Sequence, residues 1–140
     1  MVRIDCSNWQ INGEWASTIR RSVFVEEQGI DESEEWDEHD SGSTHAVAWL
    51  GEHPVGTARL LPEGKIGRMA VLPEFRSQGI GNAMLLALLA VAKEKNLSQV
   101  RLSAQQQAIG FYSRHGFVPL GEPHVEVEIP HQWMVLNLTT

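Results

Sequence analysis

The chain has 140 residues, of which 42% are hydrophobic, a size typical of one domain with a buried core, so we expect a single domain over residues 1–140. Its longest nearly apolar run, residues 83–92, is too short for a membrane-spanning helix, and the first residues lack a signal peptide's charged and apolar regions. A net charge of −7, a single cysteine and no zinc-like His/Cys spacing argue against nucleic acid, disulfides and metal. We therefore expect a cytoplasmic protein that binds no metal, membrane or nucleic acid.

The first half of the chain predicts one helix and four strands. A strand at residues 2–6 precedes a helix at residues 15–27, in which apolar residues recur at helical spacing. Short turns then join three strands that predict an antiparallel meander, at residues 45–50, 54–61 and 65–72.

An acidic segment, residues 26–40, overlaps the end of that helix. It holds nine of the 18 acidic residues and no Lys or Arg, so the rest of the chain carries nine acids against eleven bases. Two interpretations stay open for it. The segment could attract a polyamine or a basic peptide, or it could be a solvated loop or a short, poorly packed helix.

The second half predicts a long apolar helix at residues 79–95, which we expect to be largely buried. A strand, a short helix and a hairpin of two strands follow, at residues 100–104, 108–114, 125–129 and 133–138. The order of elements predicts one α+β domain in which helices pack on a sheet.

The most informative motif is Arg76-Ser77-Gln78-Gly79-Ile80-Gly81, which lies between a predicted strand and the start of the long helix. Backbone N–H groups at a helix N-terminus have no intrahelical partner and bind phosphate, and two glycines allow a close approach. Met84 stands where a dinucleotide motif needs a third small residue, and the Gly-Lys-Ser/Thr of a P-loop is absent. The motif therefore favours a diphosphate other than that of a dinucleotide or a nucleoside triphosphate.

The spacing Arg76-x-x-Gly79-x-Gly81 resembles the signature by which the GNAT superfamily of N-acetyltransferases holds the pyrophosphate of CoA. Residues 67–73 (GRMAVLP) resemble the family's fourth strand, and residues 108–117 (AIGFYSRHGF) resemble its FY-x-x-x-GF helix. Residues 21–28 and 129–131 resemble the small bacterial acetyltransferases of the YjcF and ElaA type, and the second stretch also resembles the glyphosate N-acetyltransferases.

This resemblance implies the GNAT fold, a mixed, mostly antiparallel sheet of six to seven strands with helices on both faces. It also implies an acetyl-CoA-dependent N-acetyltransferase that moves the acetyl group to a primary amine by direct attack in a ternary complex. The implied partner is a small-molecule amine, and a homodimer is compatible because many relatives dimerise.

The resemblance also assigns the cofactor-binding residues. Backbone N–H groups of a bulged fourth strand would bind the pantetheine arm and polarise the thioester carbonyl, and the turn that follows would bind the pyrophosphate. The alternative is that the glycines only make a tight turn. The implied residues are Met69, Ala70, Val71, Arg76, Gln78, Gly79, Ile80, Gly81, Asn82 and Phe111.

Two residues are implied for catalysis. Tyr112 matches the tyrosine that donates a proton to the departing CoA thiolate, although it could also be a packed core aromatic. His131 matches a histidine that acts as base, because the amine must lose a proton to attack, but it could also be structural. Glu26, Glu27 or water remain alternatives for the base.

The resemblance to the glyphosate N-acetyltransferases also implies three substrate-binding arginines, Arg20, Arg21 and Arg68, and such a cluster would suit a carboxylate or a phosphonate. Ordinary surface charge is the alternative for at least one of the first two.

Two rival functions remain open. One is an acyltransferase that uses an acylated carrier protein, as acyl-homoserine-lactone synthases do. The other is a non-catalytic acyl-CoA-binding module on the same fold.

Overall fold

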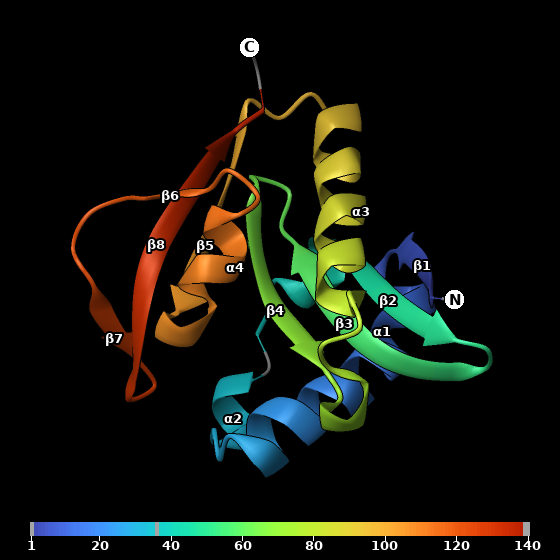
Figure 1. The fold of residues 1–140 in the computed structure, drawn as a ribbon. Helices are drawn as coiled ribbons and strands as arrows, with labels where there is room; N and C mark the ends of the chain where they lie inside the picture. Colours follow the sequence, from blue (N-terminus) through green and yellow to red (C-terminus); the bar gives the residue numbers. More distant parts are fainter. Residues whose placement is uncertain (1, 36, 139–140) are drawn as a thin grey trace.

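The computed structural model describes residues 2–35 and 37–138, which form a mixed α/β structure around one sheet (Figure 1). The strands are β1 (Val2–Ser7), β2 (Thr44–Leu50), β3 (His53–Leu60), β4 (Lys65–Val71), β5 (Gln99–Gln105), β6 (Val118–Pro119), β7 (His124–Glu126) and β8 (Ile129–Asn137). The α-helices are α1 (Trp9–Arg20), α2 (Glu32–Glu35), α3 (Ile80–Glu94) and α4 (Ile109–Ser113). A π-helical segment, η1 (Arg21–Glu27), continues α1, and the 3-10 turns are η2 (Asp40–Gly42), η3 (Pro73–Phe75) and η4 (Gln106–Ala108).

The sheet has the order β1-β2-β3-β4-β5-β8-β6, with β7 also paired to β8. Every pairing is antiparallel except that of β4 with β5. The predicted α+β fold with a mostly antiparallel sheet is therefore confirmed. The predicted count of six to seven strands is too low, because the described residues form eight. The missed strand is β6, whose two residues are too few to show a periodic pattern.

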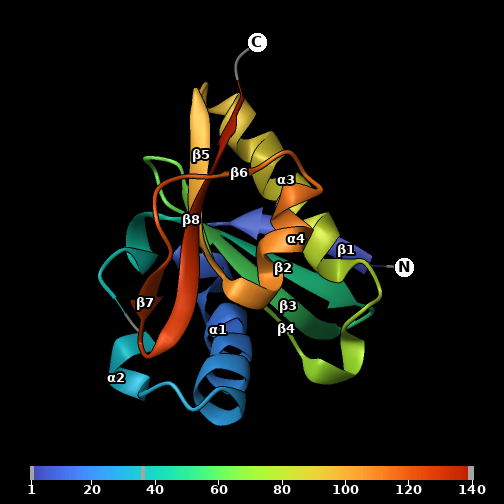
Figure 2. The ribbon, with the colours of Figure 1, turned by 60° about the vertical axis from the view of Figure 1, so that its left-hand side comes forward.

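Helices cover both faces of the sheet, as predicted (Figure 2). The apolar side chains of α3 pack in one core cluster with Ala46 and Ala48 of β2. Between these two residues Val47 points the other way, and on that face α1 lies across β2 and β3. A second cluster joins Ile19, Val23 and Phe24 to Ala70 of β4. Among the described residues, no helix combines the length and apolar character needed to cross a membrane.

The first helix begins earlier than predicted. Asn8 caps it, because its side chain accepts a hydrogen bond from the N–H of Ile11 at 3.0 Å. The expected apolar period is broken by Asn12, which is buried and donates to the carbonyls of Asp5 and His45. An asparagine is normally expected on the exposed face of a helix, so Asn12 interrupts the apolar pattern. The first two turns of the helix were therefore not predicted.

The C-terminal hairpin turns earlier than predicted. Val127 and Glu128 both have positive φ angles, 49° and 65°, and form the two-residue turn between β7 and β8. Neither residue is a glycine or asparagine, so the sequence did not mark the turn. His131 consequently lies within β8 rather than before it.

Candidate active site

The sheet opens between β4 and β5. Their parallel pairing covers only Lys65 with Arg101 and Ile66 with Leu102, and beyond these pairs the two strands separate (Figure 1). On the other edge of β4 the register against β3 shifts between Thr57 and Arg59, and Arg68 has a φ of 51°. This is the bulge that was predicted for the fourth strand. It turns the second half of β4 away from β5.

The edge of β4 that faces this gap is not paired with β5 beyond Ile66. The N–H of Leu72 donates to the carbonyl of Val55 in β3 at 2.9 Å. Because successive residues of a strand point to opposite edges, the N–H of Val71 faces the gap. The carbonyl of Val71 does so too, since it accepts from Nε of Arg76 at 2.9 Å. The same alternation directs the N–H of Ala70 toward β3, which does not support its predicted role as a donor into the gap.

A groove of about 740 Å³, here called the turn groove, runs from β4 across the start of α3 to α4. Gly79 precedes the helix with a φ of 82°, a conformation that favours glycine, and leaves Ile80 and Gly81 at the first turn. The groove brings together nine of the ten predicted cofactor residues: Met69, Ala70, Val71, Arg76, Gly79, Ile80, Gly81, Asn82 and Phe111. Gln78 lies in the same turn but does not line the groove, and Ser77 lines it instead.

Arg76 is already engaged in this structure. Its guanidinium binds both carboxylate oxygens of Glu27, at 2.7 and 2.6 Å. This hydrogen-bonded pair lowers the pKa of Glu27 and ties the end of η1 to the turn before α3. A carboxylate with a lowered pKa is a weak base, so the geometry does not support Glu27 as the general base. Glu26 is exposed and lines neither this groove nor the next one described.

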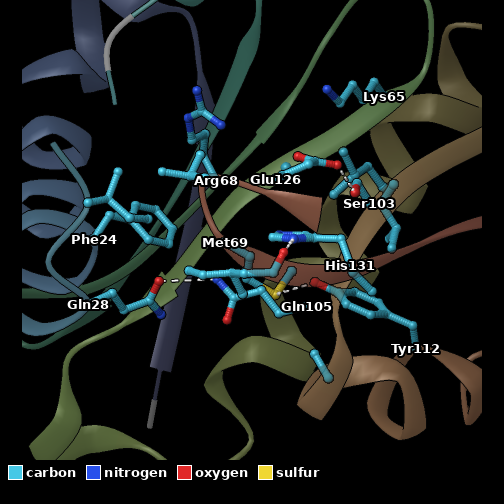
Figure 3. A pocket seen from close by; sticks show the side chains of 18 residues that line it. Phe24, Gln28, Lys65, Arg68, Met69, Ser103, Gln105, Tyr112, Glu126 and His131 are labelled. Carbon is cyan, nitrogen blue, oxygen red and sulfur yellow. Dashed lines mark hydrogen bonds between the residues drawn. The ribbon is translucent and has the colours of Figure 1, made fainter. Parts of the chain in front are cut away.

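A second groove, here called the strand groove, lies on the other side of the gap and has a volume of about 210 Å³ (Figure 3). Its walls come from η1, β4, β5, η4, α4, β7 and β8, several of which are far apart in the sequence. Of the predicted residues it contains Arg68, Met69, Tyr112 and His131. Polar residues that the sequence did not single out also line it, namely Gln28, Lys65, Ser103, Gln105 and Glu126.

The two grooves meet at four residues that line both of them, Gln28, Met69, Ala108 and Tyr112. The hydroxyl of Tyr112 lies 3.7 Å from the sulfur of Met69, at this junction. Burial raises the pKa of Tyr112 to about 12, so the hydroxyl keeps its proton at neutral pH. Tyr112 is thus both a core aromatic, as the alternative held, and a hydrogen-bond donor where the grooves meet.

His131 is oriented by its own strand. Its Nδ1 lies 2.7 Å from the carbonyl oxygen of Ile129, and because a carbonyl can only accept, Nδ1 carries a proton. In the neutral ring this leaves Nε2 as an acceptor. Figure 3 shows the ring of His131 between Glu126 and the Met69–Tyr112 pair. The structure therefore brings both predicted catalytic residues to one groove.

A cluster of three polar side chains lies beside His131 and was missed in the sequence. One carboxylate oxygen of Glu126 accepts from Ser103 and lies 2.5 Å from Nε2 of His124. Burial opposes ionisation of Glu126, but these contacts outweigh it and lower its pKa. Glu126 is therefore an anion in the groove wall. Only the hairpin pairing of β7 with β8 brings it there, and no local motif indicated that.

The three predicted arginines are not a cluster. The guanidinium of Arg20 is buried, 2.8 Å from Asp40, and stacks on Trp9, so Arg20 is a structural residue. Arg21 pairs with Glu32 on the outside of η1 and lines neither groove. The prediction that Arg20 and Arg21 bind substrate is not supported by these positions. Arg68 alone lines the strand groove.

Part of the acidic segment is held in place by ion pairs with arginines of the same chain. Asp40 is buried and binds Arg20 and Arg59, and Asp37 binds Arg59 at 2.7 Å and Arg68 at 3.2 Å. Although burial alone would raise the pKa of Asp37, hydrogen bonds from Arg59 and the nearby charges lower it. The two aspartates thus neutralise arginines from α1, β3 and β4. Trp36, between them and α2, lies outside the described residues.

Comparisons with known proteins agree with this architecture. A family model described as an acetyltransferase (GNAT) domain matches residues 5–138. The uncharacterized N-acetyltransferase YjcF of Bacillus subtilis is 39% identical over 121 residues, which cover 84% of this chain and 86% of YjcF. An acyl-CoA N-acyltransferase from Pseudomonas aeruginosa superposes with a TM-score of 0.86 at 30% identity, over 96% of this chain and 99% of that one. Escherichia coli ElaA does so with a TM-score of 0.84 at 26% identity, over 95% and 98% of the two chains. The predicted family is confirmed: the protein belongs to the GNAT family and is an acetyltransferase.

Proposed function

We propose that the protein transfers the acetyl group of acetyl-CoA to the primary amine of a small molecule, by direct attack while both substrates are bound. One observation carries this proposal. The turn groove and the strand groove meet at Met69 and Tyr112, so a donor in the first and an acceptor in the second would bring their reacting ends together.

The residues of the turn groove fit the donor. A left-handed Gly79 before α3 leaves the N–H groups at the start of that helix open to a pyrophosphate. The open edge of β4 offers the N–H of Val71 to the amide-rich arm of CoA. Arg76 would bind the pyrophosphate by exchanging Glu27 for it, because both are oxyanions that bind a guanidinium bidentately.

The strand groove supplies the proton chemistry. The amine must be neutral to attack the thioester carbonyl carbon, and Nε2 of His131 would accept the proton that the amine loses. As the carbon–nitrogen bond forms, the carbon–sulfur bond breaks and sulfur leaves with the electron pair. Tyr112 would donate a hydrogen bond to that sulfur. Because its pKa is about 12, Tyr112 stays protonated and would hold this hydrogen bond as negative charge develops on the sulfur.

Calorimetric titration with acetyl-CoA tests the donor site. Gly79→Val should abolish binding, because a β-branched residue at a φ of 82° is strained and alters the turn. Gly121→Val is the matched control. Its φ is 74°, its Cβ would also meet nothing within 4 Å, and it lies outside both grooves, so it should bind acetyl-CoA like the unmodified protein.

Release of free thiol with a panel of amines then tests the reaction. Binding without thiol release from any amine would favour a non-catalytic CoA-binding module. Failure to bind acetyl-CoA, together with release of an acyl group from an acylated carrier protein, would favour the carrier-protein alternative.

A further inference from the structure

The floor of the strand groove has two ends. Lys65, Gly67 and Met69 all line it from β4, and Ser103 and Gln105 line it from β5. Met69 and Gln105 lie at the end near Tyr112, and Lys65 and Ser103 lie at the opposite end (Figure 3). Between them, a Cβ added at Gly67 would meet nothing within 4 Å, so no side chain fills the space over the middle of β4.

Lys65 contributes the far end's positive charge. Lys65 is half-buried, and its ammonium nitrogen Nζ lies over the ring of Trp133, 5.3 Å from the ring centre. Within residues 2–35 and 37–138, no carboxylate oxygen lies at ion-pair distance from Lys65, a contrast with the arginines around it. Burial lowers the pKa of Lys65, and the charges of neighbouring arginines act in the same direction.

The nearby acids are committed to other partners. Asp37 binds Arg59 and Arg68, and Glu63 lies 3.6 Å from Arg101. Glu126, whose charge partly offsets that of Lys65, accepts from Ser103 and lies against His124. The far end therefore holds a partly desolvated cation whose neighbouring anions each bind another group.

We propose that this end of the strand groove binds a carboxylate, and hence that the preferred acceptor is an amine that also carries a carboxylate, held by Lys65. The proposal rests on the proposed function, in which the amine lies at the Tyr112 end. The acceptor would then lie along the groove, with its amine beside His131 and its carboxylate beside the ammonium of Lys65. Ion pairing in a partly buried groove favours such a ligand over its neutral amide.

Binding of reaction products tests this without turnover. The probes are N-acetylglycine, N-acetyl-γ-aminobutyrate and N-acetyl-6-aminohexanoate, each compared with its primary amide by calorimetry in the presence of CoA. We expect at least one acid to bind about tenfold or more tightly than its amide, and the chain length that does so measures the distance from the junction to Lys65. Equal binding of acid and amide at every length would overturn the proposal.

Variants then assign the preference to one side chain. Lys65→Met keeps the apolar stem and removes the charge, so the acid should bind no better than the amide. Lys65→Arg should retain most of the preference, and Lys93→Met, an exposed lysine of α3, should retain all of it. A preference that survives in Lys65→Met would assign the anion to Arg68 and reject the role of Lys65.

The two proposals fail separately. If the acids bind in a Lys65-dependent way but no amine is acetylated, the anion site stands and the proposed transfer reaction fails. If amines are acetylated but amino acids and their amides have equal kcat/KM, the reaction stands and the carboxylate site fails.

Discussion

The turn groove and the strand groove meet at Tyr112, yet they are built differently. Most of the turn groove comes from one continuous part of the chain, residues 69–82, together with α4. Backbone conformation makes much of it, through the bulge at Arg68 and the left-handed Gly79. The strand groove instead collects residues from seven elements and depends on ion pairs and hairpin pairing to place them. Under the proposed function, donor recognition would be local in sequence, whereas acceptor recognition would depend on the whole fold.

The strongest test of this comparison is Tyr112→Phe, at the junction. The hydroxyl contacts one hydrogen-bond partner among the described residues, the sulfur of Met69. Its loss should therefore leave the protein folded and change the affinity for acetyl-CoA by no more than about twofold. Turnover should fall by about 100-fold to 1,000-fold, because the leaving sulfur loses its donor. Steady-state kinetics and calorimetry on the same sample measure both. Unchanged turnover would remove Tyr112 from the mechanism.

Asp40→Asn tests the scaffold of the strand groove. Removing this charge breaks the buried ion pairs of Asp40 with Arg20 and Arg59, although Arg59 keeps its contact with Asp37, and should lower the free energy of unfolding by about 3 kcal/mol. Thermal unfolding should show a midpoint lower by about 10 °C. Asp31→Asn is the control, because Asp31 is exposed and its carboxylate accepts hydrogen bonds from the neighbouring Ser33. Equal stability of the two variants would show that Asp40 is not a structural anchor.

His131→Ala tests the proton path on the acceptor side. The rate should fall by about tenfold to 100-fold near neutral pH, and the deficit should shrink as the pH approaches the amine's own pKa of about 10, where the amine deprotonates in solution. His53→Ala changes an exposed histidine of β3 and serves as control. A pH profile parallel to that of the unmodified enzyme would reject His131 as the base.

The smallest expected effect concerns His45, which is buried beneath the same scaffold. Its Nε2 lies 2.9 Å from the carbonyl of Asp40, and burial lowers its pKa below the usual 6.5. Below pH 6.5 the unfolded chain binds a proton that the folded protein does not, so stability falls as the pH falls. His45→Gln retains a donor for Asp40 and should lack this part of the pH dependence. Thermal unfolding midpoints of both proteins at pH 5.5 and 7.5 check this prediction. An equal change in midpoint between the two pH values for both proteins would contradict it.

Most of the predicted residues do line the turn groove, because they lie in short motifs that can be recognised in the sequence. The spacing of Arg76, Gly79 and Gly81 predicts a strand-to-helix turn. The pair Phe111 and Tyr112 indicates the short helix that faces this turn. The pattern did not show which way each N–H points. Ala70 is an example, because the alternation of the strand directs its backbone N–H toward β3.

The strand groove was only partly accessible from sequence. His131 was found through resemblance, but Lys65, Ser103 and Glu126 form a group only after β4, β5 and the β7–β8 hairpin are assembled. The arginines failed for a related reason. Whether Arg20 binds a substrate or a structural aspartate depends on where Asp40 returns, and no local pattern encodes that contact across 20 residues.

The brief pairing of β4 with β5 has a consequence for solubility. Most strand edges with free N–H and C=O groups are exposed at the rim of a sheet, where a foreign strand can add to them. Here the free half of β4 lies in the middle of the sheet order, with β5 and β8 beyond it. The unpaired edge of β4 therefore lies at a place that another copy of the chain cannot reach edge to edge.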